Sequence, residues 1–237
     1  MVELEIKGYQ QSSMIEWPGK LVDSIFLGGC NFRCPYCHNP DLVFTEKTDK
    51  VDSYDVNEVL AEIDIRRETK WLDGVSITGG EPTMSTGLPK FLGILKDMGL
   101  VTKIDTNGSH PDVVKKLFDE ELLDYIAMDV KAIPEKYPKA TGVKPPLKKI
   151  KQTISLIINS GINHEFRTTV APTIVNPEED LPIIAGMIKG AKRYYIQQFR
   201  PLKCLDPAFE KKYPYSLRRL EKVCEDINGQ FEVCEVR

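Results

Sequence analysis

The feature that most constrains the fold is a repeated alternation of short apolar runs with longer segments of helical spacing. The short runs are rich in β-branched and aromatic residues, which is typical of strands. They cover 21–27, 75–78, 101–105, 125–129, 164–170 and 194–199. The segments with helical spacing cover 55–70, 88–98, 112–120, 147–160, 177–189 and 214–228. Strands that alternate with helices in this way predict a mostly parallel sheet.

The number of strand–helix units is too small to close a full barrel. We therefore expect an α/β fold, an incomplete (β/α)6 barrel, with a flat doubly wound sheet as the alternative. In either architecture the active site belongs at the carboxyl ends of the strands. Asp55 and Pro177 are predicted helix starts, Gly99 and Gly161 are predicted helix ends, and the proline-rich stretch 133–146 is a predicted loop.

Composition indicates one domain and limits the classes of ligand. A chain of 237 residues with 41% hydrophobic content can bury one sizeable core. We predict a single domain over 1–237, with a core of about 20–201 and an extension over 202–237. The formal net charge of −3 offers no excess of basic residues for nucleic acid. No apolar run approaches the about 20 residues that cross a bilayer, and the acidic start lacks a signal core, so we expect a cytoplasmic protein.

Cysteines are crowded directly after the first predicted strand, at Cys30, Cys34 and Cys37. Thiolate ligation explains this spacing better than disulfides, because neighbouring cysteines would close only a tiny ring. Three thiolates can hold three irons of a cubane and leave the remaining iron open, whereas an electron-transfer cluster takes four cysteines. The alternative is a zinc site completed by His38.

The pattern Cys30-x-x-x-Cys34-x-Tyr36-Cys37 resembles the signature of the radical S-adenosylmethionine (SAM) superfamily. This resemblance implies a [4Fe–4S] cluster on the three cysteines, whose open iron binds the amino and carboxylate groups of SAM. It also implies that Tyr36 lies against the adenine. The alternative for Tyr36 is a ring packed into the mouth of the barrel.

A second stretch, Gly79-Gly80-Glu81-Pro82, ends the second predicted strand and resembles the family motif that meets the SAM amino group. Glycine lets the backbone approach a ligand closely, and Glu81 supplies an acceptor for an ammonium group. Taken alone, a Gly-Gly pair is more often a simple turn.

Polar residues also collect where the third and fourth predicted strands end. By resemblance to activating enzymes of glycyl-radical enzymes, a monovalent cation is expected at Asp105, Thr106, Met128 and Asp129. The same resemblance implies contacts to SAM from Asp105, Asn107, Asp129 and Lys131.

Two cationic residues have alternative interpretations. Lys131 is predicted to hold the SAM carboxylate, and the alternative is a solvated loop lysine. Arg167 is expected either to point into the barrel toward an anion or to form an ion pair with Glu165.

Further details resemble the activators of anaerobic ribonucleoside-triphosphate reductase in particular. These are Trp17-Pro18-Gly19, the continuation His38-Asn39-Pro40, and an interval from Cys37 to Gly79 too short for an inserted ferredoxin domain. The resemblance implies reductive cleavage of SAM, a glycyl radical on that partner, and a flavodoxin- or ferredoxin-type electron donor. The histidine expected near the last strand is replaced by Gln197-Gln198.

Two alternatives stay open at this point. One is a radical SAM enzyme that acts directly on a small molecule or nucleoside, and the other is a zinc-stabilised interaction domain. Cys204, Cys224 and Cys234 are expected to be small buried thiols.

Overall fold

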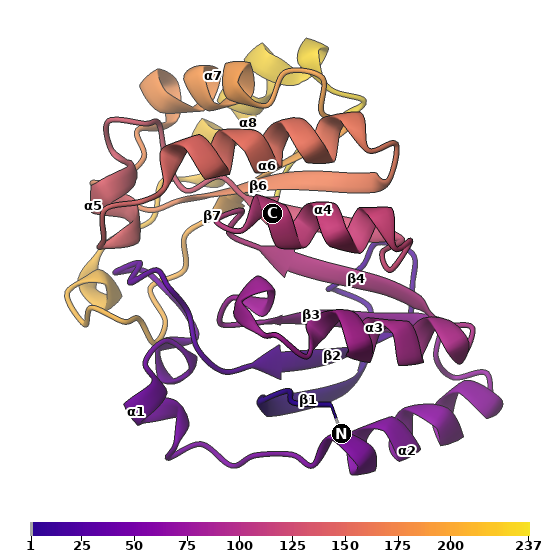
Figure 1. The fold of residues 1–237 in the computed structure, drawn as a ribbon. Coiled ribbons are helices and arrows are strands. Elements are labelled where there is room, and N and C mark those ends of the chain that lie inside the picture. The colour runs from indigo at the N-terminus through magenta and orange to yellow at the C-terminus, as the bar shows by residue number, and fades with distance from the viewer. Residues whose placement is uncertain (1) are drawn as a thin grey trace. The chain divides into compact units, whose positions relative to one another are not determined.

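The structure is a computed structural model that describes residues 2–237, except the side chains of Thr45 and Lys47. In the described residues, eight strands alternate with eight α-helices (Figure 1). The strands are β1 Ile6–Ser13, β2 Val22–Leu27, β3 Gly74–Gly79, β4 Val101–Thr106, β5 Tyr125–Asp129, β6 Asn163–Val170, β7 Arg193–Gln198 and β8 Val233–Val236. The α-helices are α1 Thr45–Thr48, α2 Val56–Glu68, α3 Leu88–Asp97, α4 Pro111–Asp119, α5 Tyr137–Thr141, α6 Leu147–Asn159, α7 Pro177–Met187 and α8 Leu217–Ile227. Short 3-10 helices are η1 Pro40–Leu42, η2 Pro82–Met84, η3 Phe209–Lys211 and η4 Asn228–Gln230.

The chain forms two compact units. The first contains Met1–Asn31, Asp41–Thr106 and Asp112–Ile126, and the second contains Phe32–Pro40, Asn107–Pro111 and Ala127–Arg237. In the first unit β1 is antiparallel to β2, while β2, β3 and β4 are parallel. In the second unit β6, β7 and β8 are parallel. Within each unit, strand order follows the order of the sequence.

The six predicted strands correspond to β2 through β7, and the six predicted helices to α2, α3, α4, α6, α7 and α8. Two strands were not predicted. β1 is an edge strand with exposed polar residues along Gln10, Gln11 and Ser12, so it lacks an apolar alternation, and β8 is only four residues long. The predicted loop 133–146 was wrong in part, because it contains helix α5. Pro138 lies in the first turn of that helix, where a missing backbone N–H costs nothing.

The predicted helix boundaries are confirmed by their capping contacts. Asp55 caps α2 by accepting hydrogen bonds from the backbone N–H groups of Asn57 and Glu58, at 2.8 and 3.1 Å. Pro177 is the first residue of α7. Gly99 and Gly161 follow their helices with φ of +77° and +75°, the left-handed conformation that ends helices.

Each unit buries its own apolar residues between helices and strands. In the first unit, Val75 and Ile77 of β3 and Phe91 of α3 are fully buried, and Figure 1 shows α3 beside β3 and β4. In the second unit, Phe166 of β6 and Ile184 of α7 are fully buried. None of the described helices is long and apolar enough to cross a membrane.

Candidate active site

In the first unit, the loop after β3 packs on the beginning of the cysteine loop. The Gly80 N–H donates to the Leu27 carbonyl, and the Glu81 N–H donates to the Gly29 carbonyl, both at 2.8 Å. A Cβ on Gly80 would collide with the Gly29 carbonyl oxygen, and one on Gly79 would collide with Leu27. These glycines are therefore required by contact between two loops. The sequence analysis explained Gly79 and Gly80 differently, by a close approach of the backbone to a ligand.

The Glu81 side chain is only 2% exposed and links two strand ends. Its Oε1 accepts hydrogen bonds from the Thr83 N–H at 3.1 Å, from the Thr83 hydroxyl, and from the Thr106 hydroxyl at 2.7 Å. Glu81 thus provides the acceptor that the sequence predicts, and its Oε1 already accepts hydrogen bonds from donors of the protein. The contact to the SAM amino group stays a prediction.

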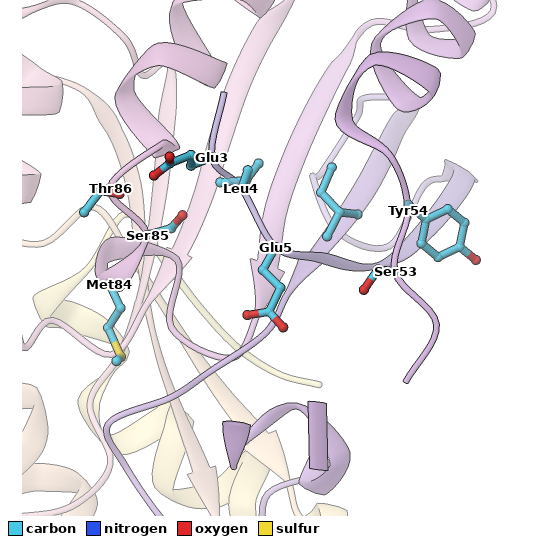
Figure 2. Close-up of a pocket in the computed structure, with 9 residues that line it drawn as sticks. Glu3, Leu4, Glu5, Ser53, Tyr54, Met84, Ser85 and Thr86 are labelled. Atoms are coloured by element: carbon cyan, nitrogen blue, oxygen red, sulfur yellow. The ribbon is translucent and has the colours of Figure 1, made fainter. Parts of the chain in front are cut away.

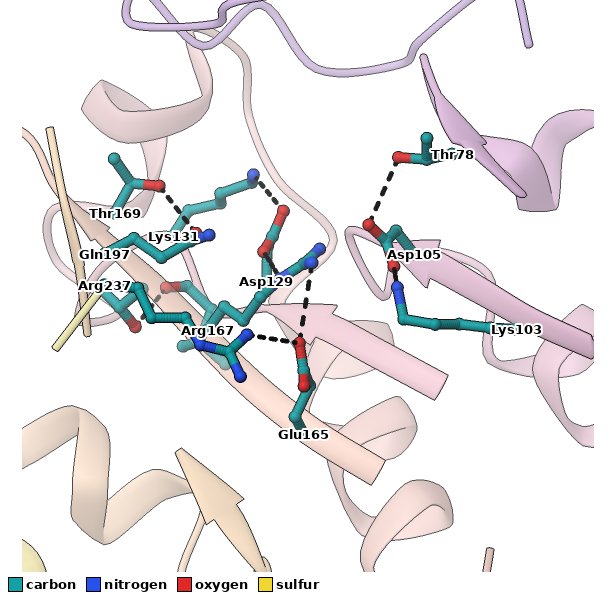
Figure 3. Close-up of polar contacts among 12 residues, drawn as sticks. Thr78, Lys103, Asp105, Asp129, Lys131, Glu165, Arg167, Thr169, Gln197 and Arg237 are labelled. Atoms are coloured by element: carbon teal, nitrogen blue, oxygen red, sulfur yellow. Dashed lines mark hydrogen bonds and ion pairs between the residues drawn. The ribbon is translucent and has the colours of Figure 1, made fainter. Parts of the chain in front are cut away.

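Lys103 and Asp105 form a buried ion pair on β4, shown in Figure 3. Residues two apart on a strand share one face, so the pair lies side by side. Lys103 is completely buried and also lies 3.4 Å from the Ser76 hydroxyl, while the Thr78 hydroxyl donates to Asp105 Oδ2 at 3.4 Å. Sequence reasoning missed Lys103, although its spacing from Asp105 could have indicated the pair.

The cysteine loop is divided between the units. In the second unit a turn joins two of its cysteines, because the Cys37 N–H donates to the Cys34 carbonyl at 3.0 Å. In the first unit the Cys30 N–H donates to the Val43 carbonyl at 3.2 Å. All three are thiols outside disulfides. Burial raises the pKa of the Cys37 thiol, and iron ligation would hold it as a thiolate.

A segment that follows β7 holds the cysteine loop within the second unit. The Leu205 N–H donates to the Cys37 carbonyl at 3.1 Å, and the Asp206 N–H donates to the Pro35 carbonyl at 2.9 Å. These contacts join residues far apart in the chain, so no local pattern indicated them.

Tyr36 is packed in the second unit with its hydroxyl buried. Its ring is 4% exposed and lies against Phe209, with 6.2 Å between ring centroids. The hydroxyl has no hydrogen-bond partner in the described residues, although buried hydroxyls are nearly always paired. Burial raises the pKa of Tyr36, so its hydroxyl stays protonated. Two thiols and an unsatisfied hydroxyl on one turn of the second unit, from Cys34, Cys37 and Tyr36, fit a loop that holds a cluster and SAM.

Asp129, at the end of β5, is the centre of a second, partly buried charge cluster (Figure 3). Its Oδ2 accepts a hydrogen bond from Lys131 Nζ and its Oδ1 one from Arg167 Nε, both at 2.9 Å. Burial alone would raise the pKa of Asp129, but the charges of Arg167 and Lys131 outweigh it and hold the pKa well below its usual value. Lys131 is therefore a partly buried, paired residue and not a solvated loop lysine.

Arg167 also forms the predicted ion pair with Glu165, at 3.8 Å. Arg237 lies 3.9 Å from the same carboxylate oxygen, and its guanidinium lies over the Tyr195 ring at 3.3 Å. The contact between Arg167 and Asp129 was not predicted. At the neighbouring strand ends, the Thr169 hydroxyl donates to Gln197 Oε1 at 3.2 Å.

Asn107 and Met128 are held by the turn after β4 in the second unit. Asn107 Oδ1 accepts hydrogen bonds from the Ser109 N–H at 3.0 Å and from the Ser109 hydroxyl at 2.6 Å. The Met128 side chain covers Gly108, where a Cβ would collide with it. Both residues lie where the sequence places them, and their roles stay predictions.

The four residues predicted for a monovalent cation divide between the units. Asp105 and Thr106 belong to the first, and Met128 and Asp129 to the second. Asp105 is paired with a lysine, and Asp129 with a lysine and an arginine. These ion pairs offset the charge of both carboxylates, and the monovalent cation stays a prediction.

His38 is held by the second unit in a way that weakens the zinc alternative. Its Nε2 lies 2.9 Å from the Arg200 carbonyl oxygen, so this nitrogen donates a hydrogen bond. The ring stacks on Phe199 with centroids 6.1 Å apart. Across residues 2–237, no group of three metal-ligating side chains surrounds a single metal-ion position.

An open cavity of about 490 Å³ lies in the first unit beside η2. Figure 2 shows its lining, which comes from the N-terminal segment up to the start of β1, the residues before α2, and the end of η2 with the residues after it: Glu3, Leu4, Glu5, Ile6, Ser53, Tyr54, Met84, Ser85 and Thr86. No residue of the predicted site lines it, so this cavity is separate from the predicted cofactor residues.

Comparison with known sequences gives consistent matches. Residues 24–184 match the family described as the Radical SAM superfamily. A Methanocaldococcus jannaschii protein whose name places it among the glycyl-radical enzyme activating enzymes is 35% identical, over 96% of this chain and 98% of its own. The pyruvate formate-lyase-activating enzyme of Streptococcus mutans is 28% identical, over 75% of this chain and 69% of its own.

The solved structure of Streptococcus suis SuiB bound to S-adenosylmethionine resembles this chain with a TM-score of 0.65 at 14% identity. The match covers 88% of this chain and 48% of SuiB, so the chain spans about half the length of that protein. At this identity the likeness shows the fold alone. It confirms the predicted fold class, an α/β incomplete barrel with parallel strands.

Proposed function

We propose that this chain, which belongs to the radical SAM superfamily, activates a glycyl-radical enzyme by cleaving SAM reductively. Enzymes of this superfamily use a [4Fe–4S] cluster and SAM. The observation that carries the proposal is the similarity, over nearly the entire length, to a relative named as an activating enzyme.

The cluster is assigned to Cys30, Cys34 and Cys37, which leaves one iron open for SAM. The three cysteines are outside disulfides, which supports this assignment. The residues assigned to SAM are Tyr36, Gly79, Gly80, Glu81, Asp105, Asn107, Asp129 and Lys131.

When bound, the cluster and SAM supply the one-electron chemistry that converts a glycine of the partner into a glycyl radical. The chain's own residues bind and orient these groups. Asp129 holds the Lys131 ammonium in place, where it can meet a carboxylate as a point charge. Thr83 and Thr106 fix the Glu81 carboxylate as an acceptor. No side chain has to act as a general base.

For the partner we propose anaerobic ribonucleoside-triphosphate reductase, with a flavodoxin- or ferredoxin-type protein as electron donor, in the cytoplasm. The short interval between Cys37 and Gly79 and the stretches Trp17-Pro18-Gly19 and His38-Asn39-Pro40 support this partner. Pyruvate formate-lyase is the second candidate, because a relative is named for activating it.

The test is electron paramagnetic resonance on the anaerobically reconstituted, reduced protein mixed with SAM and the reductase of the same organism. We expect a glycyl doublet on the reductase. If SAM is consumed and no doublet forms, the reductase is not the partner, and pyruvate formate-lyase is tested next. A colourless protein containing zinc would contradict the radical SAM activity itself.

Cysteine variants test the cluster assignment in the same preparation. Cys34→Ala should lose most bound iron and all SAM cleavage, because only two thiolates remain in the loop. Cys224→Ala, another buried cysteine in the second unit, is the matched control and should keep both. A Cys34→Ala protein that still cleaves SAM would refute the assignment.

A further inference from the structure

The basic segment, residues 136–151, carries an unusual concentration of positive charge. It contains six lysines and no acidic residue, in a chain whose formal net charge is −3. The exposed lysines are Lys139, Lys144, Lys148, Lys149 and Lys151. Lys139 donates to the Thr173 carbonyl, and the other four take part in no ion pair within the described residues. Their charge is therefore directed to solvent.

The segment touches the cysteine loop inside the second unit. The Arg33 N–H donates to the Thr141 carbonyl at 2.6 Å, and a Cβ on Gly142 would collide with the Arg33 carbonyl oxygen. Arg33 directly precedes Cys34 in the sequence. The backbone of the basic segment thus contacts the loop that carries the assigned iron ligands.

The start of α6 places lysines where helix electrostatics disfavours them. Lys148 and Lys149 stand in its first turn, which contains no acidic residue, and Pro146 provides no side-chain cap. The N-terminal end of a helix carries partial positive charge, so cations there are destabilising. α7, in contrast, has Glu178, Glu179 and Asp180 in its first turn. Lysines at a helix start that has no acidic residue and no side-chain cap are unfavourable for the helix itself. Their presence indicates a function outside the helix.

We propose that the basic segment is the docking surface for an acidic protein that carries one electron to the cluster. This inference rests on the proposed function, which requires such a carrier. One electron leaves the carrier and enters the cluster, and no covalent bond forms or breaks. Opposite charges steer the two proteins together. Electron-transfer complexes use small interfaces, so a short segment with five exposed lysines is sufficient.

Nucleic acid is the competing partner for a basic surface, and the segment suits it less well. Proteins that bind single strands present aromatic rings on which bases stack. The aromatic residue of the segment, Tyr137, is completely buried. Binding of an acidic protein requires only the exposed positive charges of the segment.

The test compares two charge-reversed holoenzymes with the wild type, using hydroquinone flavodoxin as the acidic carrier. The first variant is Lys144→Glu/Lys148→Glu/Lys149→Glu. The matched control is Lys189→Glu/Arg218→Glu/Lys222→Glu, which reverses three exposed cations elsewhere in the second unit. Stopped-flow absorbance gives the second-order rate of cluster reduction, and calorimetry gives the Kd for flavodoxin. Photoreduced 5-deazaflavin, a small uncharged donor, shows whether the cluster can be reduced when no protein docks.

We expect the first variant to be reduced by flavodoxin about tenfold more slowly at low salt and to bind it correspondingly more weakly. The difference should shrink at high salt, where charges are screened. The control variant should match the wild type, and 5-deazaflavin should reduce all three equally.

Equal flavodoxin rates and Kd values for the first variant and the wild type would overturn the proposal, as would an equal loss in the control variant. Loss of transfer-RNA binding by the first variant, with flavodoxin kinetics unchanged, would identify a nucleic-acid surface instead. If 5-deazaflavin reduces no cluster in the wild type, the proposed function fails, and the flavodoxin Kd values still decide the docking surface.

Discussion

Lys103 is a completely buried cation whose partner is the Asp105 carboxylate. Removing one member of a buried ion pair leaves the other charge without compensation, which costs about 3–5 kcal/mol. We therefore expect Lys103→Met to lower the free energy of unfolding by about that amount, measured by urea denaturation of the cluster-free protein.

The exposed pair of Lys115 and Asp119 on α4 provides the control, with side chains 58% and 59% exposed. Surface pairs of this kind contribute about 0.3–0.5 kcal/mol, so Lys115→Met should change stability little. Equal losses in the two variants would show that Asp105 does not depend on Lys103.

Asp129 leads to a prediction about pH. Its pKa in the folded protein is lowered, since Arg167 and Lys131 outweigh the effect of burial, whereas an unfolded aspartate has a pKa of about 3.9. A lowered pKa contributes stability above the unfolded value, and the contribution is lost as pH falls through the folded value. The stability difference between wild type and Asp129→Asn should be constant from about pH 5 to 8 and shrink below about pH 4.

Urea denaturation across this pH range measures the difference directly. Asp119→Asn, at the end of α4, serves as the comparison because its carboxylate is 59% exposed, and this variant should differ little from the wild type at any pH. A difference for Asp129→Asn that grows on acidification would contradict the ion pairs seen at β5.

Among the secondary-structure elements, the end of β3 packs against the start of the cysteine loop through Gly80. Gly80→Ala places a methyl group on the Gly29 carbonyl, so the two loops must separate. We expect reduced thermal stability and a lower iron content after reconstitution, because the loop that begins at Gly29 carries the cysteines. Differential scanning fluorimetry and an iron assay check both effects.

Gly186→Ala is the matched control for this substitution. Gly186 lies in the last turn of α7, and apart from its chain neighbours and nearby helix backbone no atom stands within 4 Å of the position of its added Cβ. Alanine in a helix interior is about 0.5–1 kcal/mol more favourable than glycine, so this variant should be at least as stable as the wild type. A Gly80→Ala protein that behaves like Gly186→Ala would show that the loops do not need this contact.

The whole chain contains two compact units, and an unfolding experiment can show whether they unfold together. Strand β5 is shared, since Tyr125 and Ile126 belong to the first unit and Ala127–Asp129 to the second. Both tryptophans, Trp17 and Trp71, lie in the first unit. Tryptophan fluorescence therefore reports on the first unit, while far-ultraviolet circular dichroism reports on the helices of both.

For the single domain predicted from the sequence, we expect one cooperative transition with the same urea midpoint by both probes. The cluster-free protein is the appropriate sample, because a bound cluster makes unfolding irreversible when it is lost. Two separate midpoints would show that the units unfold independently, and the chain would then count as two domains.

The order and type of the principal elements follow from the sequence alone, because the period of an apolar pattern is a local property. The sequence located the six inner strands and their helices to within a few residues. It also placed the cysteine loop after β2. The polar edge strand β1, the short β8 and the helices α1 and α5 escaped it, since none has a long apolar period.

Which residues contact one another across the chain depends on tertiary packing. The contact of Arg167 with Asp129 joins residues 38 apart, and that of Leu205 with Cys37 joins residues still further apart. Local periodicity contains no information on such pairs, because they depend on how strands and loops pack. The same packing decided that Gly80 meets a loop and that the basic segment touches the cysteine loop.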